Sequence, residues 1–199
     1  SLCFWWFGVV VFYVCSVFFN VLFFIIYGWL GFLMKICFFG DSFVNGAGDD
    51  DCLGWTGRIC SAARKAGKDI TQYNLGVRGD TSADIMGRWQ QEAAARMKTG
   101  DEGRLVFSFG ANDCAAGEDG RAQLPQTDRL KNARSIFVAA PKVWPTLVVG
   151  PVPLVGDVTA NKRLADLSRQ AGVFAKAHRV PYLDVFTTLK DSQLWQDEC

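Results

Sequence analysis

Lys35-Ile36-Cys37-Phe38-Phe39-Gly40-Asp41-Ser42 is a short apolar run that ends in a polar turn. The run over 35–39 predicts a strand that is buried in a sheet. Gly40 follows at once, and a glycine lets the backbone turn sharply and leaves the next hydroxyl exposed at the sheet edge. Ser42 is therefore positioned as a nucleophile at the carboxyl end of a buried strand.

The rest of the chain repeats this strand pattern. After Met34, short apolar runs alternate with amphipathic stretches, which is typical of β-α-β units around a parallel sheet. The predicted strands are 35–39, 70–74, 104–109, 146–149 and 180–186, and the predicted helices are 55–66, 82–98, 127–139 and 158–177. Right-handed crossovers then predict an α/β fold, a three-layer α/β/α sandwich with a five-stranded parallel sheet in flavodoxin-like order.

Composition narrows the classes of partner and cofactor. The 199 residues include 21 Lys and Arg against 20 Asp and Glu, with a net charge of +1 and one His. A charge so near zero argues against a nucleic-acid surface, and we expect no nucleic-acid partner. One His and seven cysteines without a C-x-x-C pair argue against a metal site, so we expect no metal and no cofactor. The cysteines are interpreted as small apolar residues in a reducing compartment.

Residues 1–33 differ in composition from residues 34–199, which we predict to form one domain. All 41 charged residues lie at or after Lys35, and residues 1–33 contain 13 of the 27 aromatic residues. As a helix, this segment would span roughly 50 Å, which is enough to cross a hydrocarbon core of about 30 Å. Two interpretations stand: a membrane anchor, or upstream sequence that is not translated. The protein contacts a membrane only if residues 1–33 are present in the mature protein, and it is cytoplasmic if translation starts at Met34.

Polar turns follow the first three predicted strands. They are Gly40-Asp41-Ser42, Asn74-Leu75-Gly76 and Gly110-Ala111-Asn112-Asp113. Because the carboxyl ends of parallel strands share one edge, these turns are expected to meet there. The backbone N–H groups of Ser42 and Gly76 and the amide of Asn112 are then candidate donors to an oxyanion formed when Ser42 attacks a carbonyl.

The three motifs together resemble those of the SGNH (GDSL-type) hydrolases, a family of serine esterases and lysophospholipase-like acylhydrolases. Residues 40–46 match the family's first block, 74–82 its second and 110–113 its third, and the likeness runs from about Met34 to the end of the chain. The resemblance implies a serine esterase that cleaves small-molecule carboxylic esters or thioesters through an acyl-serine intermediate. It also implies that Ser42 is the nucleophile and that Ser42, Gly76 and Asn112 form the oxyanion hole.

The chain departs from the family at the catalytic base. The family carries it in a D-x-x-H block near the C-terminus, and this sequence has no such block. His178 precedes predicted strand five, at the amino edge, so it is expected about 15 to 20 Å from Ser42 and is a poor candidate for the base. In subtilisin, loss of the base costs about 10⁶-fold in kcat. We therefore interpret the domain as incomplete at its C-terminus, truncated or frame-shifted before the catalytic Asp and His, and nearly inactive. The alternative is a noncatalytic binding module of the same fold.

Simpler roles compete at each candidate position. Ser42 is open to a role as a turn cap, Gly76 as a plain turn glycine, and Asn112 as an Asx-turn residue. Asp41 and Asp113 are expected to hold the loops rather than to react.

Overall fold

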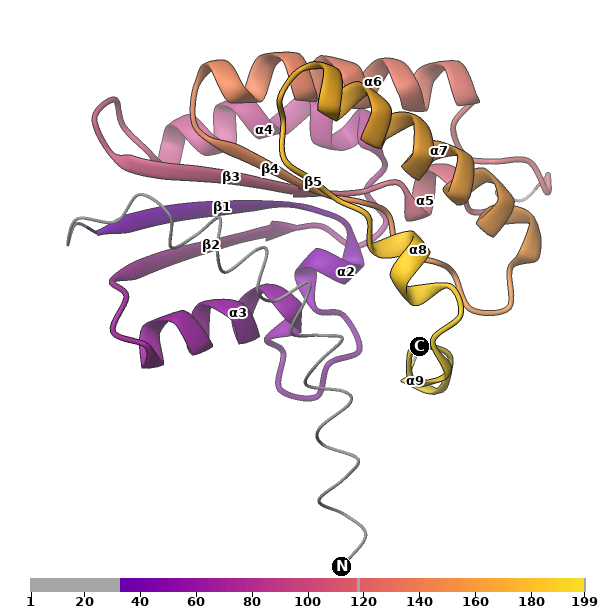
Figure 1. The fold of residues 1–199 in the computed structure, drawn as a ribbon, viewed down its shortest axis with the longest axis horizontal. Coiled ribbons are helices and arrows are strands. Elements are labelled where there is room, and N and C mark those ends of the chain that lie inside the picture. The colour runs from indigo at the N-terminus through magenta and orange to yellow at the C-terminus, as the bar shows by residue number, and fades with distance from the viewer. Residues whose placement is uncertain (1–32, 118, 199) are drawn as a thin grey trace, which may run out of the picture.

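The parallel sheet is the frame of the molecule (Figure 1). The computed structural model describes residues 33–117 and 119–198, so the two interpretations of residues 1–33 concern a segment outside the described part, Leu33 excepted. The strands are β1 (Met34–Gly40), β2 (Ile70–Gly76), β3 (Glu102–Ser108), β4 (Thr146–Val149) and β5 (Tyr182–Leu183). All neighbours pair in parallel, in the order β2-β1-β3-β4-β5. This confirms the predicted α/β fold with flavodoxin-like strand order.

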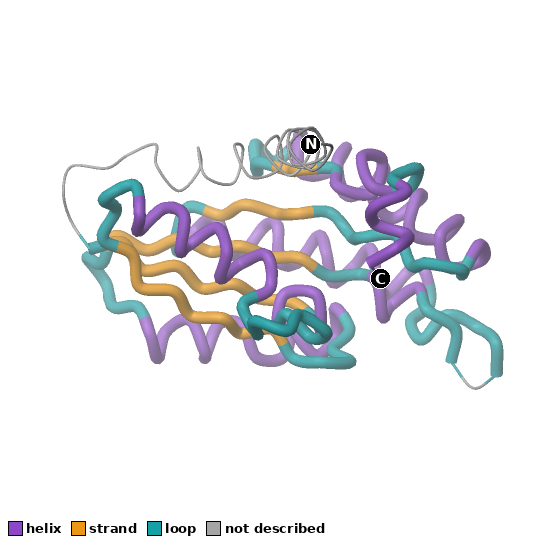
Figure 2. Tube along the Cα trace, turned by 90° about the horizontal axis from the view of Figure 1, so that it is seen from below, coloured by secondary structure: helices purple, strands orange, loops and turns teal. Residues whose placement is uncertain are grey.

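Helices cover both faces of the sheet, which gives the three predicted layers (Figures 1 and 2). One face is covered by α4 (Ser82–Arg96), α6 (Gln126–Ala139) and α7 (Val158–Ala177), and the other by α3 (Gly54–Lys65) and α8 (Val185–Leu189). The short elements are α2 (Ser42–Asn45), α5 (Ala111–Cys114), the 3-10 turn η1 (Ala140–Lys142) and α9 (Gln193–Glu198). Within the described part of the chain, no helix combines the length and the apolar character that a bilayer crossing requires.

β1 lies at the centre of two hydrophobic cores. Cys37 and Phe39 pack into the core under α4, α6 and α7, while Ile36 and Phe38 pack into the core on the α3 side. All four are fully buried. A strand buried on both faces carries apolar residues without alternation, which explains the run that opens the domain.

The predicted fifth strand, 180–186, was too long at both ends, since β5 covers only Tyr182–Leu183. The strand ends at Leu183, and Val185 and Phe186 belong to α8. Asp184 causes the change, because its carboxylate accepts hydrogen bonds from the Thr187 N–H (3.1 Å) and hydroxyl (2.7 Å). This carboxylate caps the helix, and the cap outweighs the local β-propensity of the apolar residues.

Candidate active site

Ser42 lies where β1 turns into α2. Gly40 makes the turn possible, since a Cβ there would lie 2.2 Å from Ser108 O and 2.3 Å from Val44 Cγ2. Asp41 caps α2 by accepting the Phe43 N–H at 3.0 Å. The Ser42 side chain is half-buried, and its Oγ forms no hydrogen bond with any residue that the structure describes. The hydroxyl is therefore free to engage a ligand.

Gly76 packs directly against the backbone of this turn. It is the register partner of Gly40, and a Cβ at Gly76 would lie 2.3 Å from Asn45 N and 2.8 Å from Asp41 O. Its N–H donates to Asn74 Oδ1 at 3.0 Å. An acyl oxygen that uses this N–H must share it with Asn74 Oδ1 or displace that oxygen.

Asn112 lies at the same edge, in α5 after β3. Gly110 leads into α5 with a φ of 121°, a conformation that favours glycine. Asn112 Nδ2 donates to Asp80 O at 2.9 Å, in the loop that follows Gly76. One amide hydrogen thus anchors the side chain, and the second is left for a ligand.

Register and contacts bring the three predicted residues to one edge of the sheet. Gly40 pairs with Gly76 on one side and with Ser108 on the other, so the three turns leave the sheet side by side. The Asn112–Asp80 bond ties the third turn to the second. The predicted roles of Ser42, Gly76 and Asn112 in catalysis stay predictions.

Two buried carboxyl groups support these turns. The pKa of Asp41 is raised to about 7, chiefly by burial; the bond from Phe43 N–H opposes the rise, and the neighbouring Asp113 and Asp80 carboxylates add to it. Burial also raises the pKa of Asp113, whose Oδ1 accepts the Ser82 N–H at 2.6 Å. Asp113 thereby fixes the start of α4 against α5. Both acids hold loops, as expected from the sequence.

Other candidate reactive groups do not serve this site. His178 ends α7, with its Nδ1 3.0 Å from Phe174 O and its ring stacked on Phe174. It precedes β5 at the amino edge, whereas Ser42 follows β1, whose seven residues span about 20 Å. Burial raises the pKa of Cys114 to about 12, so this thiol stays protonated and is a poor nucleophile.

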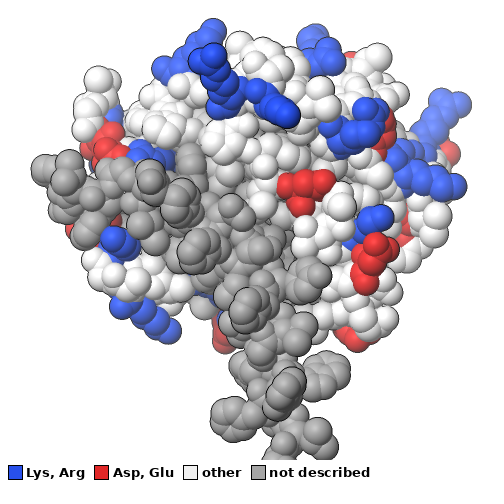
Figure 3. Space-filling model, viewed as in Figure 1, with Lys and Arg blue, Asp and Glu red and all other residues white. Residues whose placement is uncertain are grey.

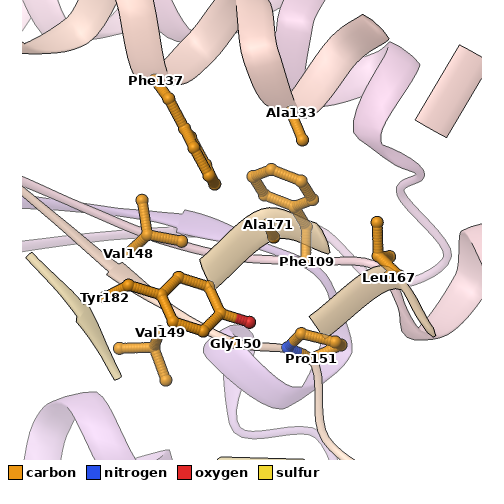
Figure 4. Close-up of a pocket in the computed structure, with 10 residues that line it drawn as sticks. All are labelled: Phe109, Ala133, Phe137, Val148, Val149, Gly150, Pro151, Leu167, Ala171 and Tyr182. Atoms are coloured by element: carbon orange, nitrogen blue, oxygen red, sulfur yellow. The ribbon is translucent and has the colours of Figure 1, made fainter. Parts of the chain in front are cut away.

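Two cavities in the described part of the structure are not lined by Ser42, Gly76 or Asn112. One is a small, partly open apolar space of about 10 Å³ beside β4 and β5, bordered by Phe109, Leu167 and Tyr182 (Figure 4). This volume barely accommodates one water, and apolar walls do not hold one. The other, of about 670 Å³, lies near Glu102 and Trp144 at the amino edge of β3. The candidate site is therefore built on the turns at the carboxyl edge and not on either cavity.

Asn74 and Arg88 also organise the site, although neither was predicted from the sequence to do so. Asn74 Nδ2 donates to the carbonyls of Val44 (2.9 Å) and Asn45 (3.2 Å) in α2, while its Oδ1 accepts from Gly76. Arg88 donates to the carbonyls at the ends of β1 and β2. The Asn-x-Gly spacing was the available signal for Asn74. The partners of Arg88 follow only from the fold.

Charges of both signs appear on the face that Figure 3 draws, with Lys and Arg gathered along its upper edge, over α6 and α7. Several acidic residues are paired, as in Lys35–Asp101 (2.7 Å) and Arg88–Asp80 (2.8 Å).

No group of three or more His, Cys, Asp or Glu side chains among residues 33–117 and 119–198 is arranged to hold a metal ion.

Comparison with known proteins identifies the family. The sequence model of the GDSL-like lipase/acylhydrolase family matches residues 38–199. The chain belongs to this family. As a GDSL-type protein it is an ester hydrolase, which acts on small-molecule esters. No curated protein sequence is a significant match.

Solved structures of GDSL-type proteins share the fold. A lipolytic protein of the G-D-S-L family from Veillonella parvula has a TM-score of 0.66 at 19% identity, over 79% of this chain and 81% of that chain. Axe2, an acetylxylan esterase from Geobacillus stearothermophilus, has a TM-score of 0.65 at 16% identity, over 79% and 80%. A variant of the esterase AlinE4 has a TM-score of 0.63 at 19% identity, over 83% and 84%. At these identities the likeness concerns the fold.

Proposed function

We propose that Ser42 is the nucleophile of this ester hydrolase and that Ser42 N–H, Gly76 N–H and Asn112 Nδ2 stabilise the oxyanion. The observation that carries the proposal is the meeting of three turns at one edge: Gly40 pairs with Gly76 and Ser108, and Asn112 bonds to Asp80. The free Ser42 hydroxyl in the first of these turns supports its role as the attacking group.

The chemistry proceeds in two acyl transfers. Ser42 Oγ attacks the ester carbonyl carbon, and the carbonyl oxygen gains negative charge that the three donors stabilise. The bond to the alcohol or thiol breaks, and the leaving group departs with a proton while the acyl group stays on Ser42. Water then attacks the acyl-serine, which releases the carboxylic acid and restores the hydroxyl. His178, at the opposite edge, is not the proton acceptor in these steps.

The proposal is tested on the natural full-length protein with p-nitrophenyl acetate, whose acetyl group is a small acyl group. We expect Ser42→Ala to abolish hydrolysis, and a sulfonyl fluoride to label Ser42 in the wild-type protein by intact mass. Ser135→Ala is the matched control, because Ser135 Oγ donates to Lys131 O on α6 and lies outside the three turns.

Equal rates for the wild type and Ser42→Ala would overturn the assignment of Ser42. A wild-type protein that binds p-nitrophenyl acetate, but neither hydrolyses it nor is labelled by the sulfonyl fluoride, would favour the second candidate, a noncatalytic binding module. The observation that favours that candidate is the position of His178, far from Ser42.

A further inference from the structure

Arg88 connects the ends of two strands directly beneath the candidate site. It lies on α4, and its side chain is 19% exposed. Its Nη2 donates to Leu75 O at 2.9 Å and to Gly40 O at 3.3 Å. Leu75 precedes Gly76, and Gly40 lies two residues before Ser42. A single guanidinium group thus joins the strand end that carries the nucleophile to the strand end that carries a predicted oxyanion donor.

The same guanidinium is linked to the third turn through Asp80. Arg88 Nε donates to Asp80 Oδ2 at 2.8 Å, and Asp80 O accepts the Asn112 amide at 2.9 Å. The carboxylate and the carbonyl of Asp80 are therefore both held, one by Arg88 and one by Asn112. Moving Asp80 would move the Asn112 side chain, so Arg88 fixes Asn112 through one intermediate residue.

The set of acceptors requires the shape of arginine. Arg88 Nη1 donates to Glu92 Oε1 at 3.1 Å, and the guanidinium lies 5.9 Å from the centre of the Phe39 ring. Two carbonyls and two carboxylates around one planar group match a rigid fork of five N–H donors. A lysine ammonium has three donors on one atom and cannot reach all four acceptors at once.

We propose that Arg88 is a positioning residue for ester hydrolysis, which holds the turns of Ser42, Gly76 and Asn112 in mutual register without touching the substrate. This inference rests on the function proposed above. Its consequence is specific, because donors aimed at a developing oxyanion act mainly in the transition state. Disturbing their register should lower kcat and leave KM nearly unchanged.

Substitutions at Arg88 and Arg96 test the inference in the full-length protein. Arg96 lies two turns further along α4 and bonds to Glu92 O at 2.9 Å, but it touches none of the three turns. With p-nitrophenyl acetate we expect Arg88→Ala to lose about 100-fold in kcat, the effect of a misplacement of about 1 Å, and Arg88→Lys about 10-fold. KM should stay within about threefold of wild type, and Arg96→Ala and Arg96→Lys should keep wild-type kcat within about twofold.

Rates are expressed per folded molecule, with the folded fraction taken from thermal unfolding. A kcat for Arg88→Lys equal to that of Arg96→Lys overturns the inference, as does a raised KM at unchanged kcat. If Arg88→Ala does not fold, the comparison of Arg88→Lys with Arg96→Lys still tests the inference. Ser42→Ala separates the two proposals. An active Ser42→Ala overturns both, whereas an inactive Ser42→Ala beside unaffected Arg88 variants overturns this inference alone.

Discussion

Replacing Gly76 by alanine should displace the turn that carries Ser42. The added methyl group would lie 2.3 Å from Asn45 N, 2.8 Å from Asn45 Cα and 2.8 Å from Asp41 O. Ordinary contacts of a Cβ begin near 3.4 Å, and all three neighbours are backbone atoms that no side-chain rotation can remove. The turn must therefore shift by about 1 Å to restore van der Waals contact.

The size of the effect follows from this displacement. Overpacking of this kind costs about 1 to 3 kcal/mol of unfolding free energy. A misplacement of about 1 Å between the nucleophile and the oxyanion donors lowers kcat by about 100-fold. Gly76→Ala is thus expected to lose both stability and kcat.

Gly87→Ala is the matched control. Gly87 is exposed in the middle of α4, and a Cβ there meets no atom within 4 Å. Because alanine favours a helix interior over glycine, this change should stabilise the protein by about 0.5 to 1 kcal/mol. Urea unfolding gives the free energies, and p-nitrophenyl acetate hydrolysis by the full-length protein gives kcat. A Gly76→Ala variant with wild-type stability and kcat would refute the packing of Gly76 on the Ser42 turn.

Two further predictions concern Asp41 and His178. Burial holds the pKa of Asp41 near 7 in the folded protein, against 3.8 ordinarily, so wild-type stability should fall as pH rises from about 4 to about 7. Asp41→Asn stays neutral and can still accept the Phe43 N–H, and its stability relative to wild type should increase across that range by up to roughly 4 kcal/mol. Urea unfolding gives the free energy of unfolding of both proteins at pH 5 and pH 8. The same difference between Asp41→Asn and wild type at the two pH values would contradict this prediction. His178→Ala should keep kcat within about twofold and lose at most about 1 kcal/mol from the Phe174 stack. A kcat loss of about 1,000-fold or more would show that His178 acts in catalysis.

Local patterns in the sequence predicted most of the strands and helices correctly. The apolar run over 35–39 predicted a buried strand correctly, because β1 is covered on both faces and therefore carries apolar residues without alternation. The predicted strand 146–149 and the predicted helix 158–177 have the same bounds as β4 and α7. The end of β5 was not predicted, because the role of Asp184 as the N-cap of α8 depends on the chain leaving the sheet after Leu183. Hydrophobic periodicity and turn glycines are local signals, so a single sequence is enough to predict the strands and helices that they mark.

What the sequence alone determined is the order of the elements and the presence of three polar turns, each at the end of a strand. Tertiary structure decided how those turns are held. Arg88 bonds to Gly40, 48 residues away, and Asn112 bonds to Asp80, 32 residues away. Such bonds depend on strand register and helix packing between distant segments, and no local pattern of residues encodes which carbonyl a side chain will meet.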